Sequence, residues 1–83
     1  MAVSVRDQLE RAAHELRRGH TGAGSRAVEE ALAELARLCS LPANAEGARV
    51  LVPLLEEALG AQQRADWIGL ADVLEHGLAA LLE

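Results

Sequence analysis

The sequence predicts an all-α protein, a small antiparallel bundle of about four helices that is completed by dimerisation. Ala and Leu supply most of the 51% of residues that are hydrophobic, and a single Trp is the whole aromatic content. Sheets need β-branched and aromatic residues to cover a pleated face, so this composition excludes an all-β fold. Apolar residues recur at helical spacing. A single domain of 83 residues buries only about 60–65% of its unfolded surface, so we expect help from a second subunit.

The first helix is expected over residues 4–18. Ser4 is a suitable N-cap, and Gly19 is typical of the residue that follows a helix end. The apolar residues of this segment recur at steps of four, three and four, which places them on one stripe of a helix. They are Val5, Leu9, Ala12 and Leu16.

The second helix is expected over residues 26–40, with Ser25 as its N-cap. Three glycines fall within residues 19–24, and this density predicts a mobile loop before the helix that nothing nearby buries. The helix ends before Pro42, because the residue that precedes a proline is disfavoured in the α conformation.

The third helix is expected over residues 44–63. Asn44 is a good N-cap, but Gly47 and Pro53 both weaken a continuous helix. The sequence leaves two alternatives open: one helix with a kink near Pro53, or a break there that separates two helices.

The fourth helix is expected over residues 66–82, with Asp66 as its cap. Its apolar positions cover well over half of the helix circumference, which indicates a helix that is buried on more than one side. Three other short helices are not expected to cover so wide a face, so we predict that part of it forms an interface. The predicted interface residues are Trp67, Ile68, Leu70, Leu74, Leu78 and Leu81.

The stretch Asp66-Trp67-Ile68-Gly69-Leu70-Ala71-Asp72-Val73-Leu74-Glu75-His76-Gly77-Leu78 resembles the C-terminal segment of small, uncharacterised bacterial helical proteins. It is also loosely similar to flagellar export chaperones of the FliT and FlgN type, which are small acidic helical proteins that hold export substrates. The resemblance implies protein binding and not chemistry. From the residues alone, Trp67 is either a core anchor at a helix start or a docking residue.

The charge and the cysteine content bear on the partners and the location of the protein. The net charge is −5, with seven Arg and seven acids in residues 1–49 but one Arg and six acids in residues 50–83. This acidic half argues against nucleic acid, which needs a basic face. The single cysteine, Cys39, cannot form an internal disulfide, and no signal-peptide pattern is visible, so we expect a cytoplasmic location. No uncharged apolar run is long enough to predict a membrane segment.

The loop region carries the alternative function. Gly19 and Gly24 have the spacing of a phosphate-binding loop, but Ser25 stands where the essential lysine would be. A weaker anion site at a helix start remains the second hypothesis. Its candidate ligands are Arg17, Arg18, His20 and Arg26.

Metal and catalytic chemistry have no matching pattern. The pairs Glu10 with His14 and Asp72 with His76 share helix faces, but we expect ordinary surface pairs and no metal. We therefore predict a protein that is not an enzyme and has no cofactor. The predicted function is a protein–protein interaction module, an adaptor, chaperone-like or small structural subunit, that forms a homodimer through the apolar face of its last helix. The alternative is a small regulatory module that binds an anion or ligand around residues 17–26.

Overall fold

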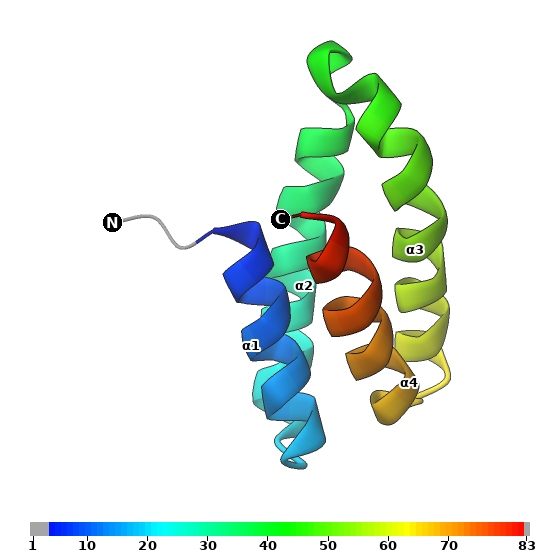
Figure 1. Ribbon diagram of the computed structural model, residues 1–83. Coiled ribbons are helices and arrows are strands. Elements are labelled where there is room, and N and C mark those ends of the chain that lie inside the picture. The colour runs from blue at the N-terminus through cyan, green and yellow to red at the C-terminus, as the bar shows by residue number, and fades with distance from the viewer. Residues whose placement is uncertain (1–3, 83) are drawn as a thin grey trace.

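The computed structural model describes residues 4–82, and this part of the chain contains four α-helices and no strand. The all-α prediction is confirmed. α1 (Val5–Arg17), α2 (Thr21–Cys39), α3 (Ala45–Gln63) and α4 (Trp67–Asp72) follow in order. A 3-10 turn, η1 (Pro42–Asn44), precedes α3, and a π-helical stretch, η2 (Val73–Ala79), continues α4. Figure 1 shows α1 and α4 in front of a longer α2–α3 hairpin.

The two ends of α1 are built as the sequence suggests. The Ser4 hydroxyl accepts a hydrogen bond from the backbone N–H of Asp7 at 3.1 Å, which caps the helix. At the other end Gly19 has a φ of +83°. The backbone N–H of His20 donates to the Glu15 carbonyl at 2.9 Å, so the chain leaves α1 through a Schellman turn.

The predicted loop over residues 19–24 is wrong, because α2 begins at Thr21 and not at residue 26. Gly24 is buried, and a Cβ on it would lie 2.7 Å from Cδ2 of Leu16. The glycine therefore allows the first turns of α2 to lie close against α1. This packing offsets the low helix propensity that suggested a loop.

Of the two alternatives for the third helix, α3 runs as one helix through Pro53. The proline is exposed, so the carbonyl that loses its backbone partner lies on the solvent side, where water can hydrogen-bond to it. The fourth helix is also one stretch, but η2 has the wider i→i+5 hydrogen bonding of a π-helix. Leucines at steps of four share one face of this helix, and Leu70, Leu74 and Leu78 are all 0% exposed.

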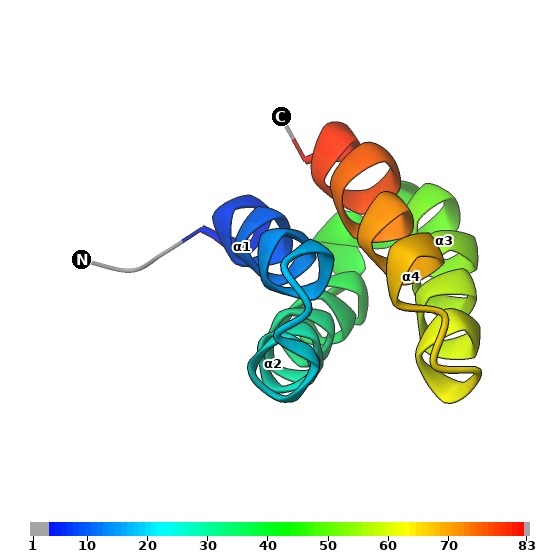
Figure 2. The same cartoon turned by 90° about the horizontal axis from the view of Figure 1, so that it is seen from below.

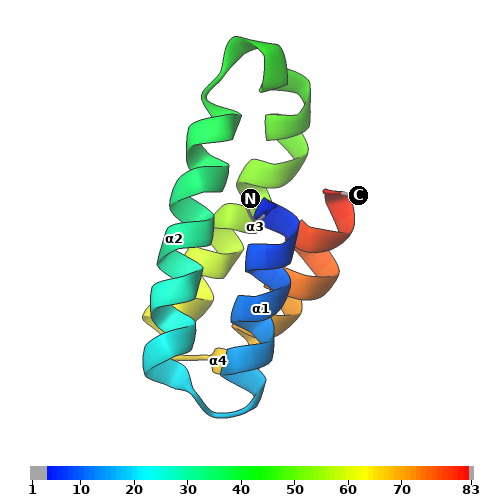
Figure 3. The same ribbon diagram turned by 90° about the vertical axis from the view of Figure 1, so that its left-hand side faces the viewer.

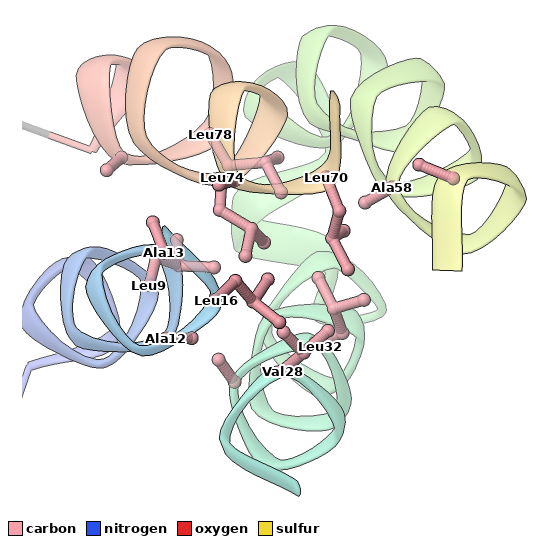
Figure 4. Packing of buried hydrophobic residues seen from close by; sticks show 14 of the residues in the cluster. Leu9, Ala12, Ala13, Leu16, Val28, Leu32, Ala58, Leu70, Leu74 and Leu78 are labelled. Atoms are coloured by element: carbon pink, nitrogen blue, oxygen red, sulfur yellow. The ribbon is translucent and has the colours of Figure 1, made fainter. Parts of the chain in front are cut away.

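The core lies where α1, α2 and α4 converge. In Figure 4, Leu16 of α1, Val28 and Leu32 of α2, Leu70 of α4 and Leu74 of η2 point toward a common centre. α4 with η2 contacts both α1 and α3, and lies between them in Figure 2. Because α2 and α3 each have 19 residues against 13 in α1, the α2–α3 hairpin extends beyond the other helices, as Figure 3 shows.

Candidate binding surface

The predicted interface on the last helix is largely core. Leu70, Leu74 and Leu78 are completely buried within the single chain, so the prediction that they meet another molecule is wrong. Trp67 is half-buried and packs against the core cluster, while Ile68 and Leu81 are 63% and 51% exposed. The sequence argument failed because α1 and α3 contact this helix from two sides and together cover its wide apolar face.

The candidate anion ligands are compensated by acids instead of converging on an open site. Arg17 donates to Asp72 at 2.8 Å and also to Glu75, which joins the end of α1 to the last helix. The hydrogen bond to Asp72 is the main cause that raises the pKa of Arg17.

The other three basic candidates do not converge on a common point either. His20 lies 2.7 Å from a Glu15 oxygen, and Arg18 lies against the ring of His14 at 3.5 Å. Arg26 is exposed on α2. No described position thus offers a set of unpaired positive groups aimed at one point.

The two acid–histidine pairs show no metal-binding arrangement. Glu10 forms an ion pair with Arg6 at 3.1 Å, and Asp72 is occupied by Arg17. Within residues 4–82, no three His, Cys, Asp or Glu side chains come together as metal ligands.

An apolar hollow of about 390 Å³ lies at the end of the α2–α3 hairpin, and we call it the apical groove. It lies between the last turns of α2, η1, the first turns of α3 and the C-terminal leucines. Its lining residues are Leu35, Leu38, Cys39, Ala43, Asn44, Gly47, Ala48, Leu51, Leu81 and Leu82. The Asn44 amide is already used, because it donates to the Leu38 carbonyl at 2.9 Å.

A second apolar hollow, of about 300 Å³, lies between α2 and α3, and we call it the lateral groove. No residue of α1 or α4 lines it. Its lining residues are Glu29, Leu32, Ala33, Ala36, Leu55, Leu59 and Gln62. Nearby on α3, Val52 is 40% exposed and Leu59 is 47% exposed, so large apolar side chains face water along this side.

The sequence-based prediction placed the whole interface on the last helix, whereas both grooves are lined mainly by residues of α2 and α3 and the turn between them. Of the predicted interface residues, only Leu81 lines a groove. The signal for the lateral groove was present in α3, where Val52, Leu55 and Leu59 follow one another at steps of three and four. The signal for the apical groove was absent, because that surface depends on how far the hairpin extends beyond α1 and α4.

These observations define a small four-helix domain with two apolar grooves on its longer hairpin. Comparison of the chain with protein-family models, curated proteins and solved structures found no match. In the part of the chain that the structure describes, no helix has the length and apolar character needed to span a membrane.

Proposed function

We propose that this protein is a non-enzymatic protein–protein interaction module, with an adaptor or chaperone-like role, that binds its partner in the apical groove. The apical groove itself carries the proposal, since it is an apolar hollow walled mainly by leucine and alanine side chains. Surfaces of this kind commonly bind protein partners. The C-terminal helix contributes through Leu81 and Leu82, beyond the part of it that is core.

The chemistry of the groove favours an amphipathic helical segment as the partner. Leucines spaced by helical turns on such a segment fit a leucine-lined hollow. The only polar side chain in the lining, Asn44, is already hydrogen-bonded within the chain. The net charge of −5 attracts a segment whose polar face is basic.

A cytoplasmic location and a homodimer are further parts of this proposal. The single cysteine supports a reducing compartment, because it has no partner in the chain for a disulfide. The anion-binding alternative receives no support from the geometry, because Arg17 and His20 both have acidic partners.

The test uses a synthetic peptide with one leucine face and a lysine-rich opposite face, and Cys39 as the reporter. Cys39 is half-buried in the groove and is the only thiol in the protein, so its rate of alkylation reports occupancy of the groove. We expect micromolar binding, between about 1 and 100 µM, and slower alkylation of Cys39 as the peptide saturates the protein.

Two controls make this test specific. Leu81→Glu should weaken peptide binding by at least about fivefold. Ile68→Glu, at a more exposed position outside both grooves, should leave it unchanged. A scrambled peptide of the same composition should not protect Cys39. Equal protection by both peptides, or equal effects of the two substitutions, would overturn the proposal.

A further inference from the structure

We infer that the lateral groove is the contact between two copies of this chain, related by a two-fold axis that runs parallel to α2 and α3. The inference rests on the homodimer in the proposed function and assigns its surface. It does not depend on what the apical groove binds.

The α2–α3 face approaches the size of a stable contact between two proteins. α2 and α3 each have 19 residues and are therefore about 28 Å long, and together they are about 20 Å wide. This gives a flat footprint of about 560 Å², and the corrugated accessible surface is larger. Stable protein interfaces bury about 800 Å² on each partner. The flat footprint reaches about 70% of that area, and side chains that stand out from it, such as Leu59, add to the contact.

The shape of the face is complementary to itself. On the α2 side the exposed residues Ala33 and Ala36 are small, whereas on the α3 side Val52 and Leu59 are large and exposed. A two-fold axis parallel to the helices places α3 of one copy against α2 of the other, in antiparallel orientation. Leu59 then fills the space above Ala33 and Ala36 of the second copy.

The charges favour the same axis. Arg37 follows Ala36, which lines the groove on α2, and Glu56 follows Leu55, which lines it on α3, so each is turned about 100° around its helix from a lining residue. Both are exposed, and Glu56 has no ion pair among residues 4–82. Arg37 donates to the Glu34 carboxylate from its Nε at 3.0 Å and from one terminal nitrogen at 2.6 Å. The other N–H groups of the guanidinium remain available for a second carboxylate. The parallel axis brings Glu56 beside Arg37 of the second copy.

A two-fold axis perpendicular to the helices would be less favourable. It would place α3 of one copy on α3 of the other, with leucine against leucine and Glu56 of one copy near Glu56 of the other. The alanines of the two α2 helices would then face each other. Large side chains would then collide where small ones leave a void, and like charges would lie close together.

The first measurement is the mass of the whole protein by sedimentation equilibrium between about 5 and 300 µM, the range in which a dimer of micromolar affinity dissociates. We expect the mass to rise from 8.8 kDa toward twice that value. Leu59→Glu should remain monomeric with an unchanged helical circular dichroism spectrum, and Ile68→Glu should dimerise as the parent does. A parent protein that is monomeric throughout, or a dimer that survives Leu59→Glu, would overturn the inference.

The second measurement fixes the axis. In a Cys39→Ser background, Ala36→Cys and Leu59→Cys proteins are mixed and treated with a short bismaleimide. We expect efficient cross-linking only in the mixture, because the parallel axis brings residue 36 of one copy to residue 59 of the other. Cross-linking that is strongest within each protein alone, or in an Ile68→Cys protein, would overturn it.

The charge contact has its own test. Glu56→Arg should weaken dimerisation about threefold, and Arg37→Glu combined with it should restore affinity, as expected for an exposed ion pair. If the double variant is weaker than both single variants, the assigned axis is wrong. Leu59→Glu should leave peptide binding at the apical groove unchanged, so failure of the dimer and failure of the proposed function are distinguishable.

Discussion

Gly22 and Gly24 show how the environment of a residue decides its role. Both lie in the first turns of α2, but a Cβ at Gly22 would meet nothing within 4 Å, whereas one at Gly24 would meet Leu16 at 2.7 Å. Leu16 is 2% exposed and has little space into which to move. We expect Gly24→Ala to destabilise the fold by about 1–3 kcal/mol and Gly22→Ala to stabilise it by up to about 1 kcal/mol.

Urea denaturation of both glycine variants measures this difference directly. The two substitutions add the same methyl group to the same helix, so each is the control for the other. Equal free energies of unfolding would show that α2 does not lie close against α1 at Gly24.

Ala65 has a backbone conformation that is unfavourable for a residue with a side chain. Its φ of +56° is the left-handed conformation that favours glycine, and it forms the turn between α3 and α4. The backbone N–H of Asp66 donates to the Ala61 carbonyl at 2.9 Å, the same Schellman pattern that Gly19 completes after α1. Ala65→Gly should therefore stabilise the protein by about 1 kcal/mol, measured as a higher midpoint of thermal unfolding. A lower midpoint would contradict this conformation of the turn.

At the scale of elements, Glu15 and His20 join the end of α1 to the start of α2. The hydrogen bond from His20 is the main cause that lowers the pKa of Glu15. A lowered pKa in the folded state stabilises the fold above the unfolded pKa, and this stabilisation is lost as the pH falls through the folded pKa. The loss therefore begins below about pH 4.3, the value for an unperturbed glutamate.

We expect Glu15→Gln to reduce the acid-induced fall in melting temperature between about pH 5 and pH 3. The effect should be small, because the pair is exposed to solvent and screened by salt. Glu10→Gln, in the same helix, is the control for a change in net charge. An identical pH profile for the parent and Glu15→Gln would contradict the Glu15–His20 contact.

The ends of a helix could be predicted from the sequence where the local signals agree with the packing, and not where they disagree. Ser4 and Gly19 mark the ends of α1 because a cap and a left-handed turn are local features. The start of α2 was missed because Gly24 is favourable only when Leu16 lies against it. The path of α3 through Pro53 could not be decided either, because it depends on which side of the helix is exposed.

At the scale of the whole molecule, a substitution of Leu78 distinguishes a core position from an interface position. It is completely buried within one chain, so Leu78→Glu would place a carboxylate in the core and should unfold the protein instead of producing a folded monomer. Leu59→Glu, at a 47% exposed position, should remain folded. Circular dichroism at low micromolar concentration compares the two, and a folded Leu78→Glu variant would show that the core does not close over this residue.

The candidate surfaces were the least predictable part of the molecule. The periodicity of residues 66–82 correctly indicated burial on several sides, but periodicity cannot say whether the covering groups belong to the same chain. The covering helices are α1 and α3, which contact the last helix from two sides and leave Leu70 and Leu74 completely buried. The grooves instead follow from unequal helix lengths, which appear only once the four helices are packed.

The extension of the α2–α3 hairpin beyond α1 and α4 also implies a gradient of local stability. Residues 40–47 are all exposed, and η1 buries no residue, so few apolar contacts oppose opening of this end. Amide hydrogens here should exchange with solvent through small local openings, while those around Leu16 and Leu74 exchange only on global unfolding. Because Ala43, Asn44 and Gly47 belong to the apical groove, that groove lies on the part of the fold that costs least to reshape. A bound partner would then slow amide exchange far more at this end than in the core.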